Sequence, residues 1–189
     1  MFKFKFIKGK ANNHPLINLI SPPYTCFKEN DDTLEKIYVL VLMNEKEQKV
    51  VGGACLTRKN LEALQEEIKC FLPMGVDHSS DFWECSTIYF PQSKLIPPQA
   101  SLQENFLRHF YSYLYEGIVA FGKQRGIGFV VVKLTANTYS PTKKFGLWPY
   151  IIQLLPTTCP DDLFYGILPL KGSFYESYRK QRNEMKRKL

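Results

Sequence analysis

The chain has 189 residues, of which 44% are hydrophobic and 23% are charged, and its formal net charge is +7. This length suits one domain with a sizeable core, and the composition is that of a globular protein. No apolar run approaches the roughly 18–20 residues that a membrane-spanning helix needs, so we expect no transmembrane segment.

The cysteines and histidines argue against a disulfide framework and against a metal site. The cysteines are odd in number, lack CxxC spacing and stand at Cys26, Cys55, Cys70, Cys85 and Cys159. The histidines lie far apart, form no HxxxH pair and stand at His14, His78 and His109. We therefore expect reduced thiols, a cytoplasmic location and no metal.

The positive charge is concentrated at the end of the chain. Residues 171–189 hold seven Lys and Arg against two Glu, a net charge of +5, which leaves +2 for residues 1–170. We expect a single domain over residues 1–170 and a basic tail over residues 171–189. A solubilising terminus is the simplest role for such a tail, and a weak contact with a polyanion is the alternative.

The N-terminal third predicts three strands. Residues 2–8 alternate apolar and basic side chains, which is a strand pattern and not that of a signal peptide. Residues 37–43 form a near-continuous apolar run, as expected for a strand covered on both faces. A polar turn at 44–48 leads into a strand at 50–56, so these two strands should form an antiparallel hairpin.

A helix and a strand with one carboxylate follow. Apolar residues between 59 and 72 recur at intervals of three and four, which predicts a helix with one apolar face. Residues 82–90 then have a strand pattern, in which Glu84 is the one carboxylate among aromatic and β-branched neighbours. Glu84 is either a base in a cleft or a polar residue on the solvent side of a half-buried strand.

The longest helix of the chain is predicted after a proline-bearing loop. Ser101 and Glu104 have the spacing of a capping box, which would start the helix. Apolar residues continue along one face until Gly126, which should end it. The apolar run at 127–134 then predicts a strand that enters the core.

The last third predicts a loop and short helix at 137–145 and strands at 148–155 and 163–168. No internal repeat or low-complexity linker interrupts the chain. The order of strands and helices predicts a mixed sheet with helices packed on it, so the fold class is α/β or α+β.

Four local motifs occur in an order typical of one acyltransferase superfamily. They are Val50-Val51-Gly52-Gly53, Trp83-Glu84-Cys85-Ser86, Phe121-Gly122-Lys123-Gln124-Arg125-Gly126 and Lys144-Phe145-Gly146-Leu147-Trp148. Over residues 33–168 the chain resembles the GNAT-type acyltransferases and, within them, the acyl-homoserine lactone (autoinducer) synthases. The resemblance implies a GNAT-like central mixed sheet, mostly antiparallel and flanked by helices. It also implies transfer of an acyl group to an amine.

The chain departs from the autoinducer synthases at several positions. Thr87 stands where the family has an arginine after Glu-x-Ser, and the arginine near the Gly-rich strand is replaced near Cys55, although Arg58 is close. The N-terminal region that closes over the donor in the synthases is short and broken by prolines here. The glycine-rich pyrophosphate loop of acetyl-CoA users is missing as well, and residues 90–101 stand in its place.

Acyl transfer to an amine needs a base for the ammonium, donors for the thioester oxyanion and an acid for the leaving thiolate. The resemblance makes Glu84 the candidate base and Tyr139 the candidate acid. With eleven tyrosines in the chain, a structural role for Tyr139 is the alternative. Backbone amides at Ile88, Tyr89 and Phe90 would hold the thioester carbonyl and the pantetheine arm.

The phosphate of the acyl donor would lie at the start of the long helix. The amides of Ser101, Leu102 and Gln103 are the candidate donors there, with Lys94 close by. A loop without glycines cannot wrap a pyrophosphate closely, so acyl-phosphopantetheine on an acyl-carrier protein stands beside acyl-CoA as a donor. Loss of donor binding is the remaining interpretation of this loop.

Three functions remain open at this point. The first is an N-acyltransferase that uses acyl-CoA or an acyl-carrier protein as donor and an amine as acceptor. The second is an acyl-homoserine lactone synthase that uses S-adenosylmethionine, which Thr87 and the short N-terminal region disfavour. The third is a non-catalytic GNAT-fold protein that binds a partner or nucleic acid through its basic tail.

Overall fold

The computed structural model describes the strands, one long helix and a few flanking residues. The described positions are 2–8, 35–43, 49–60, 62, 81–89, 91, 95–135, 144, 150–155, 163–170, 176 and 180. The predicted loop and short helix at 137–145, apart from the helical and exposed Lys144, and nearly all of the basic tail therefore lie outside the described residues. Within the tail, Glu176 and Lys180 are helical and exposed.

The described chain forms seven strands and one long helix. The elements are β1 (Phe2–Lys8), β2 (Lys36–Met43), β3 (Lys49–Asn60), β4 (Asp81–Tyr89), α2 (Ala100–Arg125), β5 (Phe129–Thr135), β6 (Tyr150–Leu155) and β7 (Leu163–Pro169). Each predicted strand is present, with shifts of its ends. The predicted fold class, a mixed and mostly antiparallel sheet with helical cover, is confirmed.

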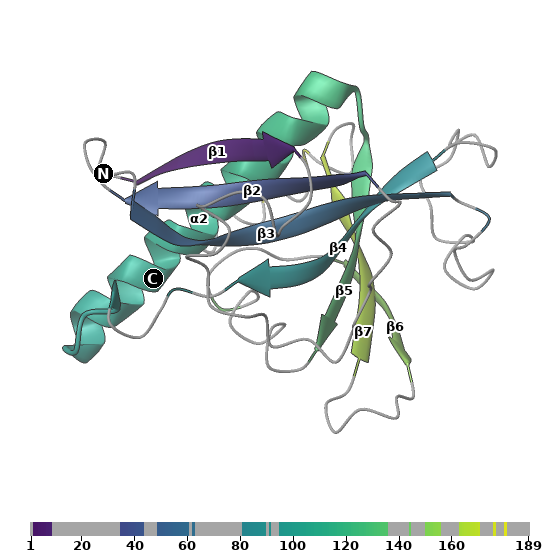
Figure 1. The fold of residues 1–189 in the computed structure, drawn as a ribbon. Helices are drawn as coiled ribbons and strands as arrows, with labels where there is room; N and C mark the ends of the chain where they lie inside the picture. The colour runs from purple at the N-terminus through teal and green to yellow at the C-terminus, as the bar shows by residue number, and fades with distance from the viewer. Residues whose placement is uncertain are drawn as a thin grey trace.

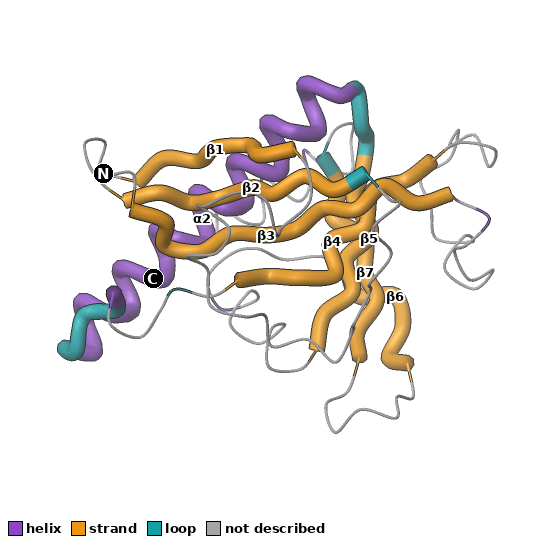
Figure 2. Tube along the Cα trace, in the orientation of Figure 1, coloured by secondary structure: helices purple, strands orange, loops and turns teal. Residues whose placement is uncertain are grey.

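All seven strands belong to one sheet, in the order β1-β2-β3-β4-β5-β7-β6. Every neighbouring pair is antiparallel except β4 and β5, which are parallel. The predicted hairpin of β2 and β3 is confirmed, with Val39 opposite Ala54. Figures 1 and 2 show α2 crossing one face of this sheet, in the position of the connection that a parallel strand pair requires.

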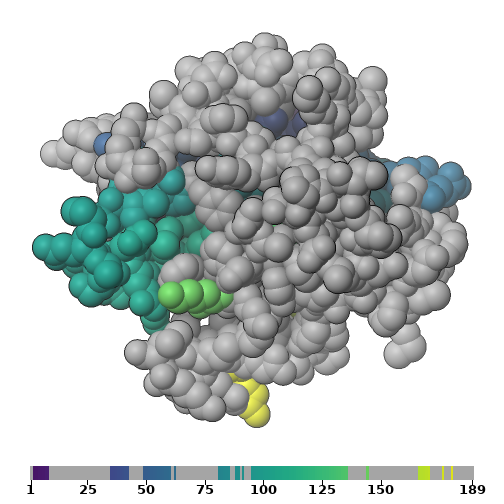
Figure 3. All heavy atoms as spheres, turned by 90° about the horizontal axis from the view of Figure 1, so that it is seen from below, coloured from purple at the N-terminus to yellow at the C-terminus, as the bar shows by residue number. Residues whose placement is uncertain are grey.

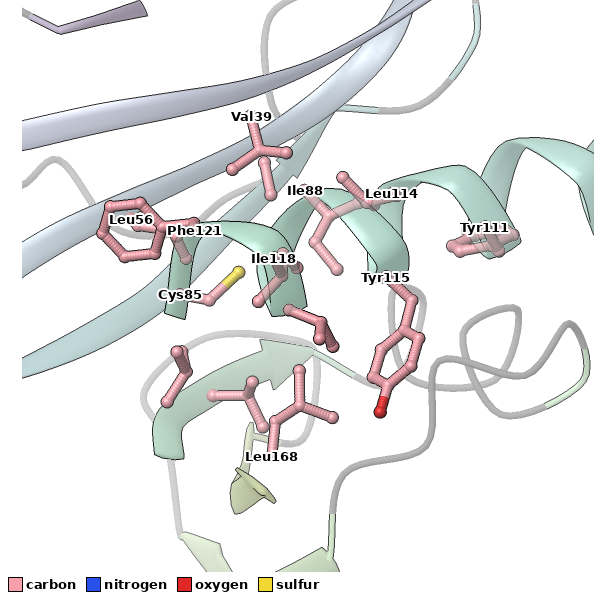
Figure 4. Close-up of a cluster of buried hydrophobic side chains, with 14 of the residues drawn as sticks. Val39, Leu56, Cys85, Ile88, Tyr111, Leu114, Tyr115, Ile118, Phe121 and Leu168 are labelled. Carbon is pink, nitrogen blue, oxygen red and sulfur yellow. The ribbon is translucent and has the colours of Figure 1, made fainter. Parts of the chain in front are cut away.

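The main core lies between α2 and this face of the sheet. The alternating phenylalanines of β1 point toward the helix, so that Phe2 meets Phe106 with ring centroids 5.4 Å apart. In the centre, side chains from β2, β3 and β4 interlock with Leu114 and Ile118 of α2 (Figure 4). Each such side chain contributes about 1.5–3 kcal/mol when it is removed from water. This burial fixes α2, and with it the connection from β4 to β5.

The opposite face of the sheet carries a second set of buried side chains. Its members come from β1, β2 and β3 and are Ile7, Tyr38, Leu40, Leu42, Val50 and Cys55. Because side chains alternate along a strand, Thr57 and Lys59 of β3 also belong to this face. The polar C-terminal end of β3 therefore adjoins this second cluster of buried apolar side chains.

Three predicted boundaries are wrong for identifiable reasons. The helix predicted from Lys59 cannot start there, because Lys59 and Asn60 are the last residues of β3. The capping box is also wrong: the N-cap of α2 is Gln99, which makes no side-chain cap hydrogen bond. The strand predicted from Ile127 starts at Phe129, because the Ile127 amide donates back to the Gly122 carbonyl at 2.8 Å. Gly126, with φ of 69°, permits this turn.

Gly117 allows α2 to approach the sheet closely. A Cβ atom there would lie 2.6 Å from Val39 Cγ1, closer than Cβ atoms approach other atoms in folded proteins, and 3.2 Å from Phe4 Cγ, which is a tight contact. We expect Gly117→Val to lower the free energy of unfolding by about 1–3 kcal/mol through overpacking, measured by urea denaturation. Glu116→Val, on the exposed side of the same turn, is the matched control and should change it much less. Equal effects would mean that helix propensity, and not packing, decides the loss.

Charged residues join several elements at one end of the fold. Glu35, just before β2, lies 3.2 Å from Lys8 Nζ, and 3.5 Å from guanidinium nitrogens of both Arg58 and Arg125. Arg58 also forms an ion pair with Asp81 at the start of β4. Lys8 lowers the pKa of Glu35 most, while burial opposes this shift and the two arginines add to it.

The lowered pKa of Glu35 predicts a pH dependence of stability. A carboxylate whose pKa is lower in the folded state stabilises the fold above its ordinary pKa, here 4.5, and loses that contribution as the pH falls through the folded value. Glu35→Gln should therefore reduce the free energy of unfolding at pH 7 by about 0.2–1 kcal/mol, since its partners are largely exposed. Urea denaturation below pH 4.5 should show that difference shrinking; a constant difference would contradict the assignment.

No helix in the part of the chain that the structure describes combines the length and the apolar character that crossing a bilayer requires.

Candidate active site

The candidate site lies where β4 and β5 separate. The two parallel strands are paired only at Glu84–Val131 and Cys85–Val132. Beyond Cys85, β4 remains paired with β3, while β5 remains paired with β7 as far as Thr135. Figure 1 shows β4 and β5 diverging from this point. The sheet therefore opens between its two central strands, and we call this opening the β4–β5 gap.

A bulge in β4 accompanies the opening. Cys55 of β3 is opposite Thr87, but the next residue, Leu56, is opposite Cys85, so Ser86 is an extra residue in β4. A bulge of this kind bends its strand and increases the local twist. The bend begins directly after Cys85, the last residue that β4 pairs with β5. The bulge thus accounts for the divergence of the two strands.

Glu84 is a buried carboxylate one residue before the gap. It lies between Thr57 on β3 and Val131 on β5, and its residue is 2% exposed. The solvent-side interpretation of Glu84 is therefore wrong. Its neighbour Trp83 points to the other face, where its ring packs on Phe121 with centroids 4.9 Å apart. Glu84 thus stands on the face opposite α2.

Lys59 is the partner of Glu84. Its Nζ atom donates a hydrogen bond to Glu84 Oε1 at 2.8 Å. The two side chains reach each other diagonally across the β3–β4 pair, since Lys59 is opposite Phe82 and Thr57 is opposite Glu84. The side chain of Lys59 is 17% exposed and that of Glu84 is 3% exposed. An ion pair this deeply buried is stabilised by its own short contact and is sensitive to loss of either member.

Lys59 was not among the residues predicted for the site. The sequence drew attention to Arg58, because it lies near the position of a missing arginine of the autoinducer synthases. In the structure Arg58 points to the α2 side of the sheet and pairs with Glu35 and Asp81. The cation that faces Glu84 is instead the next residue, which alternation places on the opposite face.

Ile88 and Tyr89 follow the bulge and border the β4–β5 gap through their backbone. The Ile88 side chain is buried in the α2-side core, and Tyr89 lies on the other face near Tyr38. The pKa of Tyr89 is strongly raised, mainly by burial and further by Cys55 and Cys85. Its phenol therefore remains protonated at neutral pH and is able to donate a hydrogen bond but not to act as a base.

The start of α2 presents a smaller set of amides than the sequence predicted. Ser101, Leu102 and Gln103 lie in its exposed first turn, and the teal atoms of the early part of α2 reach the surface in Figure 3. The Gln103 amide, however, donates to the Gln99 carbonyl at 2.8 Å. This amide thus has a partner within the helix, and its predicted contact with a phosphate stays a prediction. Ser101 and Leu102 belong to the first turn, where helix amides have no partner within the helix.

Three predicted site residues lie outside the described residues, namely Tyr139, Phe90 and Lys94. Their roles stay predictions. In the structure, Glu84 and Lys59 contact each other beside the β4–β5 gap. The start of α2 follows β4 in the sequence.

This arrangement has a definite chemical capacity. A carboxylate is able to accept a proton from an ammonium group. Beyond Cys85, the edge of β4 that faces the gap pairs with no other strand among the described residues, and backbone N–H groups of such an edge are able to donate to a carbonyl oxygen. Exclusion of water strengthens both interactions. The site therefore suits a reaction in which an amine meets a polarised carbonyl.

The same fold is found in solved structures of low sequence identity. FeeM, an N-acyl amino acid synthase from uncultured soil microbes, is matched over 96% of this chain and 94% of that chain, with a TM-score of 0.53 and 9% identity. A bacterial toxin is matched over 96% of both chains, with a TM-score of 0.51 and 6% identity. BjaI, a CoA-dependent acyl-homoserine lactone synthase, is matched over 83% of this chain and 68% of that chain, with a TM-score of 0.46 and 14% identity.

At such identities these matches show the fold alone. The two matches with a TM-score above 0.5 show that FeeM and the bacterial toxin share the fold of this chain. No family model matches the chain, and a comparison with curated proteins gives no match.

Proposed function

We propose that this GNAT-type fold is an N-acyltransferase, which moves an acyl group from a thioester donor to an amine acceptor. The observation that carries the proposal is the position of Glu84, a buried carboxylate at the point where β4 and β5 separate. A carboxylate is costly to bury, and here it lies beside an opening in the sheet rather than in a closed core.

The proposed reaction uses the site as follows. Glu84 accepts a proton from the ammonium group of the acceptor, and the free amine attacks the thioester carbon. The C–N bond forms and the C–S bond breaks, so that the products are an amide and a thiol. Amides of β4 beyond the bulge, at Ile88 and Tyr89, bind the carbonyl oxygen as charge develops on it. Tyr139 is the proposed proton donor to the leaving thiolate.

The donor is proposed to lie along the β4–β5 gap, with its phosphate toward the start of α2. The amides of Ser101 and Leu102 and the ammonium of Lys94 are the proposed contacts there. Acyl-CoA and the phosphopantetheine of an acyl-carrier protein are the two proposed donors. The GNAT-type fold supports acyl transfer in general and does not distinguish between these two acyl donors.

Two other functions are weighed against this proposal. Synthesis of acyl-homoserine lactones from S-adenosylmethionine is disfavoured by Thr87, although Lys59 restores one positive charge to the site. A non-catalytic role through the basic tail requires no buried carboxylate. The Lys59–Glu84 pair therefore favours an enzyme.

The proposal is tested by incubating the purified protein with acyl-CoAs of different chain length and a panel of amines. Thiol release and the mass of the N-acyl product are the measurements. We expect thiol release that depends on the amine, with one amide formed per thiol. Acylated carrier protein is tested in parallel as donor, and S-adenosylmethionine as acceptor. Absence of thiol release, amide product and donor binding with every combination would contradict the proposal.

A further inference from the structure

Two bulges enclose the stretch of β3 that pairs with the end of β4. In β4 the extra residue is Ser86, and in β3 it is Val51, whose two neighbours are opposite adjacent residues of β2. Between the bulges, residues 53–55 of β3 pair with residues 87–89 of β4. The pairing of β4 with β5 has already ended there. Among the described strands, β3 alone therefore positions the end of β4 that borders the β4–β5 gap.

Gly52 lies against the last residue of β4. A Cβ atom on Gly52 would be 2.5 Å from the carbonyl oxygen of Tyr89 and 2.9 Å from Phe110 Cε2 of α2. Cβ atoms in folded proteins do not approach other atoms so closely, so a side chain at this position would displace one or both groups. The neighbouring Gly53 differs, because the atoms nearest to its missing Cβ belong to β2. Of the two glycines, Gly52 is thus the one that bears on β4.

The displacement that a side chain at position 52 would cause is directed toward the gap. β3 lies on one side of β4, and β5 lies on the other. Phe110 is completely buried in a packed core, so its ring has little room to move. The Tyr89 carbonyl would then move away from β3, where β4 has no pairing with β5 to hold it in place. Such a movement would narrow the gap.

We propose that Gly52 is a positioning residue for the acyl donor. Its lack of a side chain lets the end of β4 lie close to β3, which keeps the β4–β5 gap open and holds the amides of Ile88 and Tyr89 in place for the thioester. Gly52 contacts neither donor nor acceptor and acts through the backbone of Tyr89. This inference rests on the proposed acyltransferase function and adds a residue on which donor binding depends.

A purely structural role for Gly52 is the alternative. In that case the glycine serves only the close packing of β3 on Phe110, and the contact with the Tyr89 carbonyl has no consequence for the gap. The two roles are separable, because a smaller side chain at position 110 relieves the contact with α2 and leaves the contact with β4 unchanged.

Gly52→Ala tests the proposal through the affinity for the donor, measured by titration calorimetry. The probe is hexanoyl-CoA, or a hexanoylated acyl-carrier protein if the wild-type protein binds that donor instead. We expect the Kd to rise about 10–100-fold, because a shift of about 1 Å in a preorganised site has effects of this size. The KM for the amine should stay unchanged, since Glu84 precedes the bulge in β4. Gly117→Ala, which overpacks α2 against β1 and β2, is the matched control and should lower the melting temperature without changing the Kd.

A second pair of variants keeps the test decisive if Gly52→Ala folds poorly. Phe110→Leu makes room on the α2 side, and the addition of Gly52→Ala to Phe110→Leu should still weaken donor binding by about tenfold or more. Equal donor affinity with and without Gly52→Ala, in folded protein of either background, would overturn the inference. A wild-type protein that binds and uses the donor keeps the proposed function in that case, whereas a wild-type protein that binds no donor loses both.

Discussion

Glu84→Gln should reduce kcat/KM for acyl transfer by about 10²–10⁴-fold, the usual contribution of a positioned general base. Glutamine has nearly the same shape as glutamate, and its carbonyl oxygen still accepts a hydrogen bond from Lys59. It cannot take up a proton from the acceptor ammonium, however. The loss should therefore appear in the chemical step, while binding of the acyl donor remains close to that of the wild-type protein.

The matched control is Glu116→Gln, an identical change at an exposed position of α2. It should leave the rate of amide formation and the melting temperature unchanged. If Glu84→Gln retains wild-type kcat/KM while the protein transfers acyl groups, Glu84 is a structural residue and the reaction has another base. Single-turnover kinetics with preloaded donor distinguishes a loss in chemistry from a loss in binding.

Lys59→Met should reduce the free energy of unfolding by about 3–5 kcal/mol, because it leaves a deeply buried carboxylate without its partner. Glu84 is inaccessible to water at the centre of the sheet, and the 2.8 Å contact with Lys59 Nζ is its shortest described interaction. Methionine preserves most of the length and apolar surface of the lysine stem. The loss therefore measures charge rather than packing, and urea denaturation at pH 7 detects it.

The double variant Lys59→Met with Glu84→Gln tests this explanation. With the carboxylate removed, no buried charge remains unpaired, so much of the stability should return. The control Lys49→Met should change the free energy of unfolding by less than about 0.5 kcal/mol, as for an ordinary exposed residue. If the double variant instead loses as much free energy of unfolding as the two single variants together, the two residues do not interact energetically, and the explanation is wrong.

The sequence predicted the fold well where side-chain patterns are periodic. The alternation of β1, the apolar run of β2 and the long apolar face of α2 each reflect burial on one or two faces of an element. Gly126 marked the end of α2 because a left-handed residue is required there. The start of α2 was misplaced by two residues, since the N-cap Gln99 uses no side chain to cap the helix.

The end of β3 explains why Lys59 was missed. Thr57, Arg58, Lys59 and Asn60 are polar, so they have the composition of a loop or of a helix start. They remain in a strand because its two faces meet different counter-charges: Arg58 pairs with Asp81 on one face and Lys59 with Glu84 on the other. Those partners come from β4, more than twenty residues later, and no local pattern shows them.

The position of the site also depends on how the residues of β4 pair with those of β3 and β5. Glu84 was singled out from its sequence, but its place beside the gap follows from the extra residue Ser86 in β4 and from the two-residue pairing with β5. A bulge shifts every later side chain to the opposite face, and the sequence of β4 does not mark where that shift occurs. The pairing of strands had to be seen before the site was recognisable.

In the proposed function, an acyl donor lies in the β4–β5 gap with its thioester next to Glu84. A crystal structure with an acyl-CoA analogue, in which a methylene group replaces the thioester sulfur, tests this claim most directly. We expect the analogue to lie between β4 and β5, with its carbonyl oxygen within hydrogen-bond distance of a backbone amide at residues 87–89. An analogue bound elsewhere, or a gap closed by the protein's own side chains, would contradict it.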